Sequence, residues 1–424
     1  MLFTRPSNEK GAAWPAILVG LFAAFGGILY GYDTGTISGI QTMPYWIEEF
    51  DNPNAGRIAL IVSILSVGTF VGALAAGIMA DITGRRWGII LSAMLPFNLG
   101  VALQTAATSQ PLFIAGRFFA GLGVGLISAQ SVLIGRSSFE FMANCSSPDT
   151  PRFLIKKGND TQALRSLVFL RRLSADDPDL LAEMEELKNN WEYEKSIGSA
   201  SYLECFKGTA GKRTITGIIL QSLQQLVGIN FIIYYGTSYF AENVQGLPDS
   251  FILQVIVNSI NVVMTLPGLW AIDRFGRRPV LLTGALASTF GPCAWVVTGE
   301  IFSLQTRAKG LSMTTAANWF FNWLLSYITP YLTGALNPTQ SNVFWIWGSF
   351  CWIAFVFTFT MIYETKGLSL EQVNELYESV SKAWRSANYR SELRRMSVSE
   401  AYRKESVDEE TKPSEMACED SSKV

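Results

Sequence analysis

Side-chain amides and phenols recur inside an otherwise apolar stretch that covers residues 214–240. It contains Gln221, Gln224, Gln225, Asn230 and a pair of tyrosines. Each amide offers both donors and acceptors, which suits a ligand covered with hydroxyl groups, whereas a fixed charge would suit an ion or a carboxylate. Spacings of three and four residues put the glutamines on one helical face and its neighbouring positions. The pattern predicts a sugar-like ligand; hydrogen bonding between helices is the alternative for any single amide.

Three later apolar stretches extend this pattern with Asn261, Trp295, and the pair Asn318 and Asn322. The last two are four residues apart and therefore share a helical face. A tryptophan can offer its ring to the apolar face of a sugar and its indole N–H to a hydroxyl. We expect these residues to line the same site, with interfacial anchoring as the alternative for Trp295.

Asp33 lies near the end of the first apolar stretch, and Arg117 lies near the start of the fourth. An ionisable group inside the bilayer is costly enough to indicate a function or a partner, and Arg117 is the expected counter-ion of Asp33. We expect a proton-responsive or gating pair, with a static salt bridge as the alternative. The chain contains no histidine, so a proton-coupled step near neutral pH would fall to a carboxylate with a raised pKa.

The elements that must position these residues are apolar stretches long enough to cross a bilayer, which takes about 20 residues. The chain has 424 residues, of which 49% are hydrophobic and 16% charged, a composition typical of a membrane protein. Nine stretches are found, at residues 14–37, 58–80, 87–107, 114–134, 214–240, 251–272, 279–302, 311–336 and 342–363. The predicted fold class is therefore an all-α membrane protein.

A short phrase occurs twice, each time after an apolar stretch: Asp81-Ile-Thr-Gly-Arg85-Arg86 and Asp273-Arg-Phe-Gly-Arg277-Arg278. We call these the first and second arginine boxes. Arginines at the end of a spanning helix favour the cytoplasmic side, and similar phrases in two halves indicate a duplicated transport fold.

Four regions follow from these patterns. They are a transmembrane half at 1–135, a cytosolic linker with short helices at 136–212, a second transmembrane half at 213–363, and a cytosolic amphipathic helix with a disordered tail at 364–424. The linker has helical periodicity at 161–173 and 180–191.

Composition and motifs also exclude several classes of function. The net charge of -2 is spread along the chain, so nucleic acid is not an expected partner. The five cysteines lack metal-site spacing, and no nucleophile, metal cluster or phosphate loop stands out. We expect no enzyme activity, no cofactor and no metal site.

Together, the motifs resemble those of the sugar porters of the major facilitator superfamily, in particular the fungal hexose and monosaccharide transporters. The resemblance covers residues 14 to about 377. Besides the two boxes, it is carried by Gly116-Arg-Phe, Pro148-Asp-Thr-Pro-Arg152, Gln224-Gln-Leu-Val-Gly-Ile-Asn230, Gly299-Glu-Ile-Phe and Glu364-Thr-Lys-Gly-Leu. It implies an alternating-access carrier whose two halves rock about a sugar held midway across the membrane.

The resemblance also assigns roles to residues. Gln224, Gln225, Asn230, Asn261, Trp295 and Asn318 match positions that contact sugar, with Asn322 close to them. Asp33 matches the carboxylate that carries the coupled proton in symporters, with Arg117 as its partner; because facilitators of this type also have an aspartate there, symport and facilitated diffusion both stay open. A cytoplasmic gate is implied at Asp81, Arg85, Arg86, Arg152, Asp273, Arg277, Arg278, Glu300, Arg307 and Glu364.

Two blocks depart from the family, which has twelve spans. Residues 130–147 do not resemble it, and the family motif that normally follows the sixth helix comes next, so the fifth and sixth helices are missing, together with a sugar-contacting glutamine. Residues 279–289 resemble the first half of the ninth helix and residues 290–302 the last half of the tenth. Both departures are typical of a mispredicted or alternatively spliced gene.

The fused stretch at 279–302 has two possible arrangements. If it crosses the membrane once, Arg307 lies outside, against the positive-inside tendency. If it turns back at Gly291-Pro292, the charges stay inside, but arms of about 11 to 13 residues leave turn backbone unpaired in the membrane.

The resulting prediction is transport of a hexose such as glucose by alternating access, as a facilitator or a proton symporter. We expect a monomer that spans the plasma membrane several times. The alternatives are a non-transporting glucose sensor, which a tail of about sixty residues does not favour, and an inactive truncated product.

Overall fold

The computed structural model describes residues 31–51, 53–134, 154–155, 158–171, 174–197, 201–243, 249–286, 291–303, 306–336, 340–368 and 370–389. Within some helices, for example at residues 80–87 and 129–134, it describes the backbone alone. The described residues form helices, turns and loops without strands, which confirms the all-α prediction.

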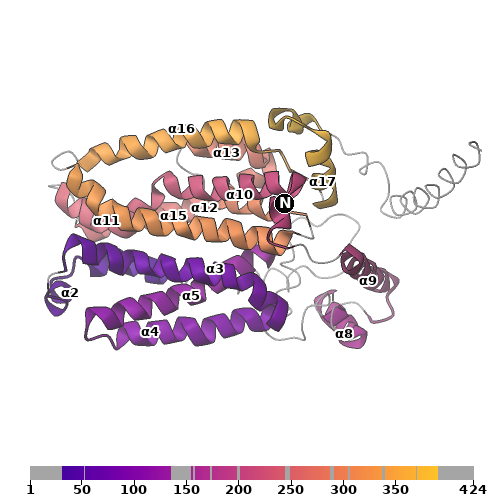
Figure 1. The fold of residues 1–424 in the computed structure, drawn as a ribbon, viewed down its shortest axis with the longest axis horizontal. Coiled ribbons are helices and arrows are strands. Elements are labelled where there is room, and N and C mark those ends of the chain that lie inside the picture. Colours follow the sequence, from indigo (N-terminus) through magenta and orange to yellow (C-terminus); the bar gives the residue numbers. More distant parts are fainter. Residues whose placement is uncertain are drawn as a thin grey trace, which may run out of the picture.

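The helices form two bundles that lie side by side (Figure 1). The first contains α2 (Pro44–Glu49), α3 (Ala55–Ser92), the π-helix η1 (Ala93–Phe97), α4 (Asn98–Thr105) and α5 (Gln110–Ile134). The second contains α10 (Gly208–Leu226), α11 (Ile229–Asn243), α12 (Ser250–Phe275), α13 (Arg277–Leu286), α14 (Gly291–Glu300), α15 (Arg307–Ala335) and α16 (Val343–Met361).

Shorter elements gather at one end of the bundles (Figure 1). They are α8 (Asp160–Arg171), α9 (Pro178–Ile197), η2 (Glu204–Phe206), α17 (Leu370–Ser379) and η4 (Ala383–Asn388). The helices predicted in the linker and after residue 364 are therefore present. The second arginine box lies at the same end, because Glu364, which leads into the α17 segment, contacts its backbone. We call this end the cytoplasmic end, following the positive-inside rule.

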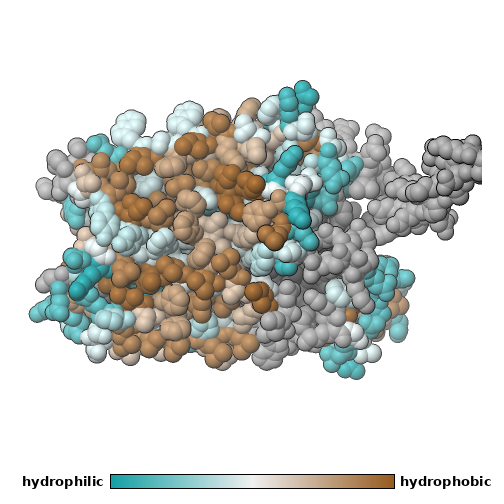
Figure 2. Space-filling view, in the orientation of Figure 1, coloured by the Kyte–Doolittle hydropathy of each residue, from teal (hydrophilic) through white to brown (hydrophobic). Residues whose placement is uncertain are grey.

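The bundles have the surface of a membrane protein. In the described part of the chain, five helical segments are long and apolar enough to span a bilayer, namely Ala55–Met79, Gln110–Ser128, Gly208–Asn243, Ser250–Phe275 and Val343–Met361. The space-filling view has a broad hydrophobic band between more polar ends (Figure 2). Helix α15, with 29 residues, is about 44 Å long and also reaches across.

The first arginine box lies where α3 reverses direction. The hydroxyl of Ser92 lies 3.8 Å from the sulfur of Met79, whereas the same separation along a straight helix would be about 20 Å. The chain therefore folds back between these residues, where the box occurs. The side chains of Asp81, Arg85 and Arg86 lie outside the described set.

Helices α3 and α5 pack with their backbones in contact. A Cβ atom added at Gly68 would lie 2.2 Å from the carbonyl oxygen of Phe118, and one at Gly121 would lie 2.1 Å from that of Leu65. Small residues allow this approach in a bilayer, where lipid gives helices no hydrophobic reason to associate. We expect α3 and α5 to move as one rigid unit.

Helices α13 and α14 form a re-entrant pair. Arg277 at the start of α13 bonds to Glu300 at the end of α14 over 2.8 Å. The first residue of α13 and the last residue of α14 therefore lie together at the cytoplasmic end. Each has ten residues and is about 15 Å long, half the thickness of the hydrocarbon core. Of the two arrangements left open by the sequence, the structure adopts the one that turns back, which keeps Arg307 at the cytoplasmic end. The connecting residues 287–290 lie outside the described set.

Helix α15 joins the two bundles, because it packs against α3 of the first and α10 of the second. Contacts run along its length: a Cβ at Gly56 would lie 2.8 Å from the hydroxyl of Tyr331, and one at Gly77 would lie 3.9 Å from the Cβ of Ser312. The polar side chains predicted on α10 and α15 therefore lie close to the boundary between the bundles.

Candidate functional site

The three glutamines of α10 face α15 and surround Asn318. The side-chain nitrogen of Asn318 donates to the amide oxygens of Gln221 and Gln224, both over 2.7 Å. Its oxygen accepts from the amide nitrogen of Gln225 over 2.9 Å. The spacing that predicted a common face for these residues thus brings them to one partner on another helix.

Gln225 extends the network to two further asparagines. Its amide oxygen accepts from the side-chain nitrogens of Asn230 and Asn322, the latter over 3.3 Å. The hydroxyl of Tyr234 donates to the side-chain oxygen of Asn322 over 3.1 Å. We call Gln221, Gln224, Gln225, Asn230, Asn318 and Asn322 the amide cluster; each member is at most 9% exposed.

The break between α10 and α11 places Asn230 against Gln225. It occurs at Gly228, whose φ of +87° suits glycine. The ring of Trp347 packs so closely there that a Cβ at Gly228 would lie 2.4 Å from it. Both conditions require glycine at this position.

The re-entrant helix α14 borders the cluster. Gln221 donates to the hydroxyl of Thr298 over 3.1 Å, and Gln224 donates to the backbone oxygen of Gly291 over 2.9 Å. Trp295 lies on the same short helix and is half-buried. Its place on a helix that borders the cluster leaves its contact with a ligand a prediction.

Asn261 is not brought into the cluster. Its side chain is exposed on α12, and only 6% of that span is buried. Asn261 was predicted to line the site because it is a polar residue within an apolar stretch and matches a family position that contacts sugar, but two family helices are missing from the first half of the sequence. The exposed face of α12 is consistent with that loss.

Asp33 and Arg117 form the predicted ion pair. Their closest charged atoms are 3.8 Å apart, with side chains 13% and 1% exposed. This separation is longer than a hydrogen bond. Within the described residues, the Nε and Nη2 atoms of Arg117 have no hydrogen-bond partner, so the pair is held by charge rather than by a saturated network.

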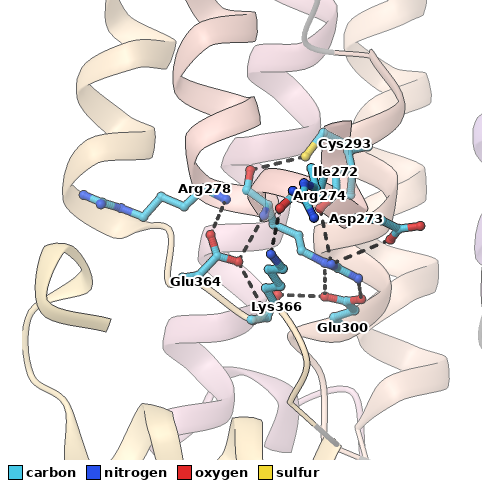
Figure 3. A network of polar contacts seen from close by, with 10 residues as sticks. Ile272, Asp273, Arg274, Arg278, Cys293, Glu300, Glu364 and Lys366 are labelled. Carbon is cyan, nitrogen blue, oxygen red and sulfur yellow. Dashed lines mark hydrogen bonds and ion pairs between the residues drawn. The ribbon is translucent and has the colours of Figure 1, made fainter. Parts of the chain in front are cut away.

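A charged network that includes Asp273, Glu300 and Glu364 lies at the cytoplasmic end (Figure 3), and Arg277 is at its centre. Its guanidinium donates to both carboxylate oxygens of Glu300, over 3.1 and 2.8 Å, and lies 3.9 Å from Asp273. Burial alone would lower the pKa of Arg277, but the hydrogen bonds and charge of Glu300, with Asp273 and Glu364, raise it above its usual range. Paired bonds of this kind are among the strongest that side chains make.

Glu364 ties the chain beyond α16 to the second arginine box. Its carboxylate accepts from the backbone N–H groups of Arg277 and Arg278, both over 3.0 Å. Thr365 beside it donates to Glu300 over 2.7 Å. Gly276, with a φ of +102°, leaves room for the carboxylate, which a Cβ there would approach to 2.6 Å.

The other predicted gate residues are distributed as follows. The side chain of Arg278 points away from Glu300 (Figure 3) and lies over the ring of Phe359 at 5.3 Å. Arg307 begins α15 at the same end and is half-buried. Arg152 lies outside the described residues, as do the three side chains of the first box.

Sequence reasoning missed several contributors to the cluster. Thr298 and Ser66, whose hydroxyl donates to Asn322 over 2.6 Å, are ordinary hydroxyl residues in apolar helices. Tyr234 stood out only as part of a polar run. No sequence signal separates such residues from the many other hydroxyls, because their role comes from the neighbour that packing supplies.

The chain matches the model of the family described as "Sugar (and other) transporter" in three pieces, at residues 19–138, 131–289 and 285–377. The pieces meet at 131–138 and 285–289, the same two places at which the sequence departs from the sugar porter pattern.

Similar curated proteins come from fungi. The "Major facilitator-type transporter ecdD" of Aspergillus rugulosus is 44% identical over 495 residues, covering 90% of this chain and 91% of the relative. The "Probable glucose transporter rco-3" of Neurospora crassa is 34% identical, covering 92% and 84%. The "High glucose sensor RGT2" of Saccharomyces cerevisiae is 32% identical, covering 90% and 63%. Each alignment is longer than this chain, so the relatives carry residues that it lacks.

Among solved structures, the proton:xylose symporter XylE of the major facilitator superfamily, bound to 6-bromo-6-deoxy-D-glucose, matches with a TM-score of 0.68. The match covers 86% of this chain and 99% of that one at 22% identity. The inward open conformation of XylE from E. coli matches with a TM-score of 0.63. The family match, the fungal relatives and this fold lead to one conclusion: the chain belongs to the sugar (and other) transporter family, as a multi-pass membrane protein with the major facilitator fold and fewer helices than the complete fold.

Proposed function

We propose that this protein carries a monosaccharide, a hexose such as glucose, across the plasma membrane by alternating access. The observation that carries the proposal is the amide cluster. Six neutral amides meet near the boundary between the two bundles, buried and without a formal charge among them. Such a set recognises hydroxyl groups in many orientations.

The cluster allows binding by exchange of hydrogen bonds. Without sugar, the amides bond to one another, so no buried polar group of the cluster is left without a partner. A sugar hydroxyl can replace an amide partner as both donor and acceptor, so the net free energy of each exchange is small. A site of this kind can bind a sugar and release it again, as a carrier requires.

A carrier also requires a gate that can close and open, and we assign this role to the charged network at the cytoplasmic end. Arg277, Glu300 and Glu364 hold together the start of α13, the end of α14 and the segment that follows α16. In alternating access, these bonds must break for the sugar to leave toward the cytoplasm. We expect them to stabilise the state that is closed on that side.

The test is uptake of labelled glucose by cells that lack their own hexose carriers and express this chain at the surface. The expected result is saturable uptake that unlabelled hexoses inhibit. If the chain reaches the surface in amounts that antibody labelling detects and no uptake occurs, the proposal is wrong for this chain.

A second candidate function is glucose sensing without transport, because a relative at 32% identity is named a high glucose sensor. A sensor would bind glucose with the same amides. Purified protein that binds glucose, together with proteoliposomes that do not take it up, would favour this second function over the first.

A further inference from the structure

Ser66 joins the amide cluster from the other half of the molecule. It lies on α3 and is fully buried, and its hydroxyl donates to the side-chain oxygen of Asn322 over 2.6 Å. Among the hydrogen bonds that the structure records for the amide cluster, the partners other than Ser66 all lie between α10 and α15. Ser66 is therefore the contribution of the first bundle.

The bond from Ser66 determines how the Asn322 amide is oriented. The side-chain oxygen of Asn322 accepts from both Ser66 and Tyr234, which uses both of its lone pairs. With the oxygen held in this way, the nitrogen points toward Gln225. That nitrogen carries two hydrogens, of which one satisfies Gln225 and the other can donate to a ligand hydroxyl.

Ser66 is itself held in place. Its neighbour Leu65 contacts Gly121 of α5 through backbone atoms, and its own backbone oxygen accepts from the hydroxyl of Thr69 over 2.8 Å. The hydroxyl thus projects from the rigid α3–α5 unit, and its position depends on how the two bundles are placed relative to each other.

We infer that Ser66 is a positioning residue of the sugar site, which orients Asn322 for the ligand and makes this orientation depend on contact between the two halves. The inference rests on the proposed function. When α3 and α15 separate near Ser66, Asn322 loses the hydrogen bond from Ser66, and the site loses a correctly oriented donor. Sugar affinity and the closeness of the halves are coupled through this one bond.

The experiment compares Ser66→Ala with Ser63→Ala in the full chain, by glucose uptake in cells without their own carriers. Ser63 is a matched control: it lies on the same helix, is also fully buried, and its hydroxyl has no hydrogen-bond partner among the described residues. We expect Ser66→Ala to raise KM about three- to tenfold, the effect of one buried hydrogen bond, with Vmax per surface molecule unchanged. Ser63→Ala should keep the wild-type KM.

A double-mutant cycle with Asn322→Ala separates positioning from structural damage. If Ser66 acts through Asn322, Ser66→Ala has no further effect on KM once Asn322 has been removed. Independent effects that multiply, or a KM for Ser66→Ala equal to that of Ser63→Ala, would overturn the inference. A change in surface amount alone, with KM unchanged, would also overturn it, because that is what a merely structural residue gives.

The result for the wild-type chain shows whether a failure concerns the inference about Ser66 or the proposed function. If the wild type transports glucose and the Ser66 variant behaves like the control, the inference fails and the proposed function stands. If the wild type neither transports nor binds glucose, the proposed function fails and the inference fails with it. If it binds without transport, the same variants are compared by the Kd for glucose of the purified protein, with the same expected ratio.

Discussion

Gln225 contacts more of the amide cluster than its place in the sequence indicates. It donates to Asn318 and accepts from Asn230 and Asn322. Removing its amide leaves three buried polar groups short of a partner, and each such loss costs about 1–3 kcal/mol. A single residue therefore links α10, α11 and α15 through the amide cluster.

We accordingly expect Gln225→Ala to raise the KM for glucose uptake more than about tenfold and to lower the thermal stability of the purified protein. Gln254→Ala is the matched control, because Gln254 is similarly buried and, in the described part of the chain, donates within its own helix, to Asn258. Equal effects of the two substitutions on KM would contradict a role for Gln225 in binding.

At Asp33, the question is whether the ion pair with Arg117 carries a proton. We expect Asp33→Asn to abolish accumulation of sugar against a gradient while sparing exchange of sugar across the membrane, because exchange does not require release of the proton. Transport assays in proteoliposomes with and without a pH gradient measure both. Asp51→Asn, at an exposed position with a positive φ that asparagine tolerates, is the control. Unchanged accumulation in Asp33→Asn would refute symport.

At the scale of elements, the cytoplasmic network connects the start of α13, the end of α14 and the segment after α16. Glu300 receives two bonds from Arg277 and one from Thr365. These bonds are made only while the three elements lie together, so they stabilise one conformational state over the other.

Glu300→Gln keeps the shape of the side chain but removes its charge, and we expect it to increase the population open to the cytoplasm several-fold. Cys293 reports this change, since it is 2% exposed and its thiol donates to the backbone oxygen of Arg277. Its rate of alkylation, followed by mass spectrometry, should rise in Glu300→Gln. The rate should stay at the wild-type value in Glu185→Gln, a change at an exposed position on α9. No difference between the two variants would contradict the role of the network.

The elements also show where prediction from the sequence succeeded. Spans, linker helices and the shared face of the α10 glutamines follow from periodicity and composition, which are local properties. The direction of α13 and α14 did not follow, because charge opposed a single crossing whereas unpaired turn backbone opposed turning back. Asn261 was assigned to the site from its polar side chain and its family position, and no local property of α12 indicates that its side chain is exposed. Ser66 and Thr298 are recognised only through their partners.

At the scale of the whole molecule, the re-entrant pair fixes the side of the membrane on which the chain continues. Helices α15 and α16 then return the chain to the end where Arg277 lies, as the contacts of Glu364 require. The chain after α16 therefore lies at the same end as the second arginine box, the arrangement that the positive-inside rule expects.

We expect an epitope tag at the carboxyl end to react with antibody only after cells are permeabilised. A tag inserted after the exposed residue Asp51, at the opposite end of the bundles beside α2 (Figure 1), should react in intact cells. If α13 and α14 instead crossed as one helix, both tags would react in intact cells. That result would contradict the arrangement described here.

The short arms of the re-entrant pair also have a consequence for the surrounding lipid. Helices α13 and α14 fill about half of the hydrocarbon thickness. Leu286, the last residue of α13 and the one farthest from the cytoplasmic end, is 55% exposed. Acyl chains of the outer leaflet must cover this surface, or the bilayer must thin beside it, and both adjustments depend on chain length. Hydrophobic mismatch thus makes lipid composition a determinant of how stably this bundle holds the amide cluster.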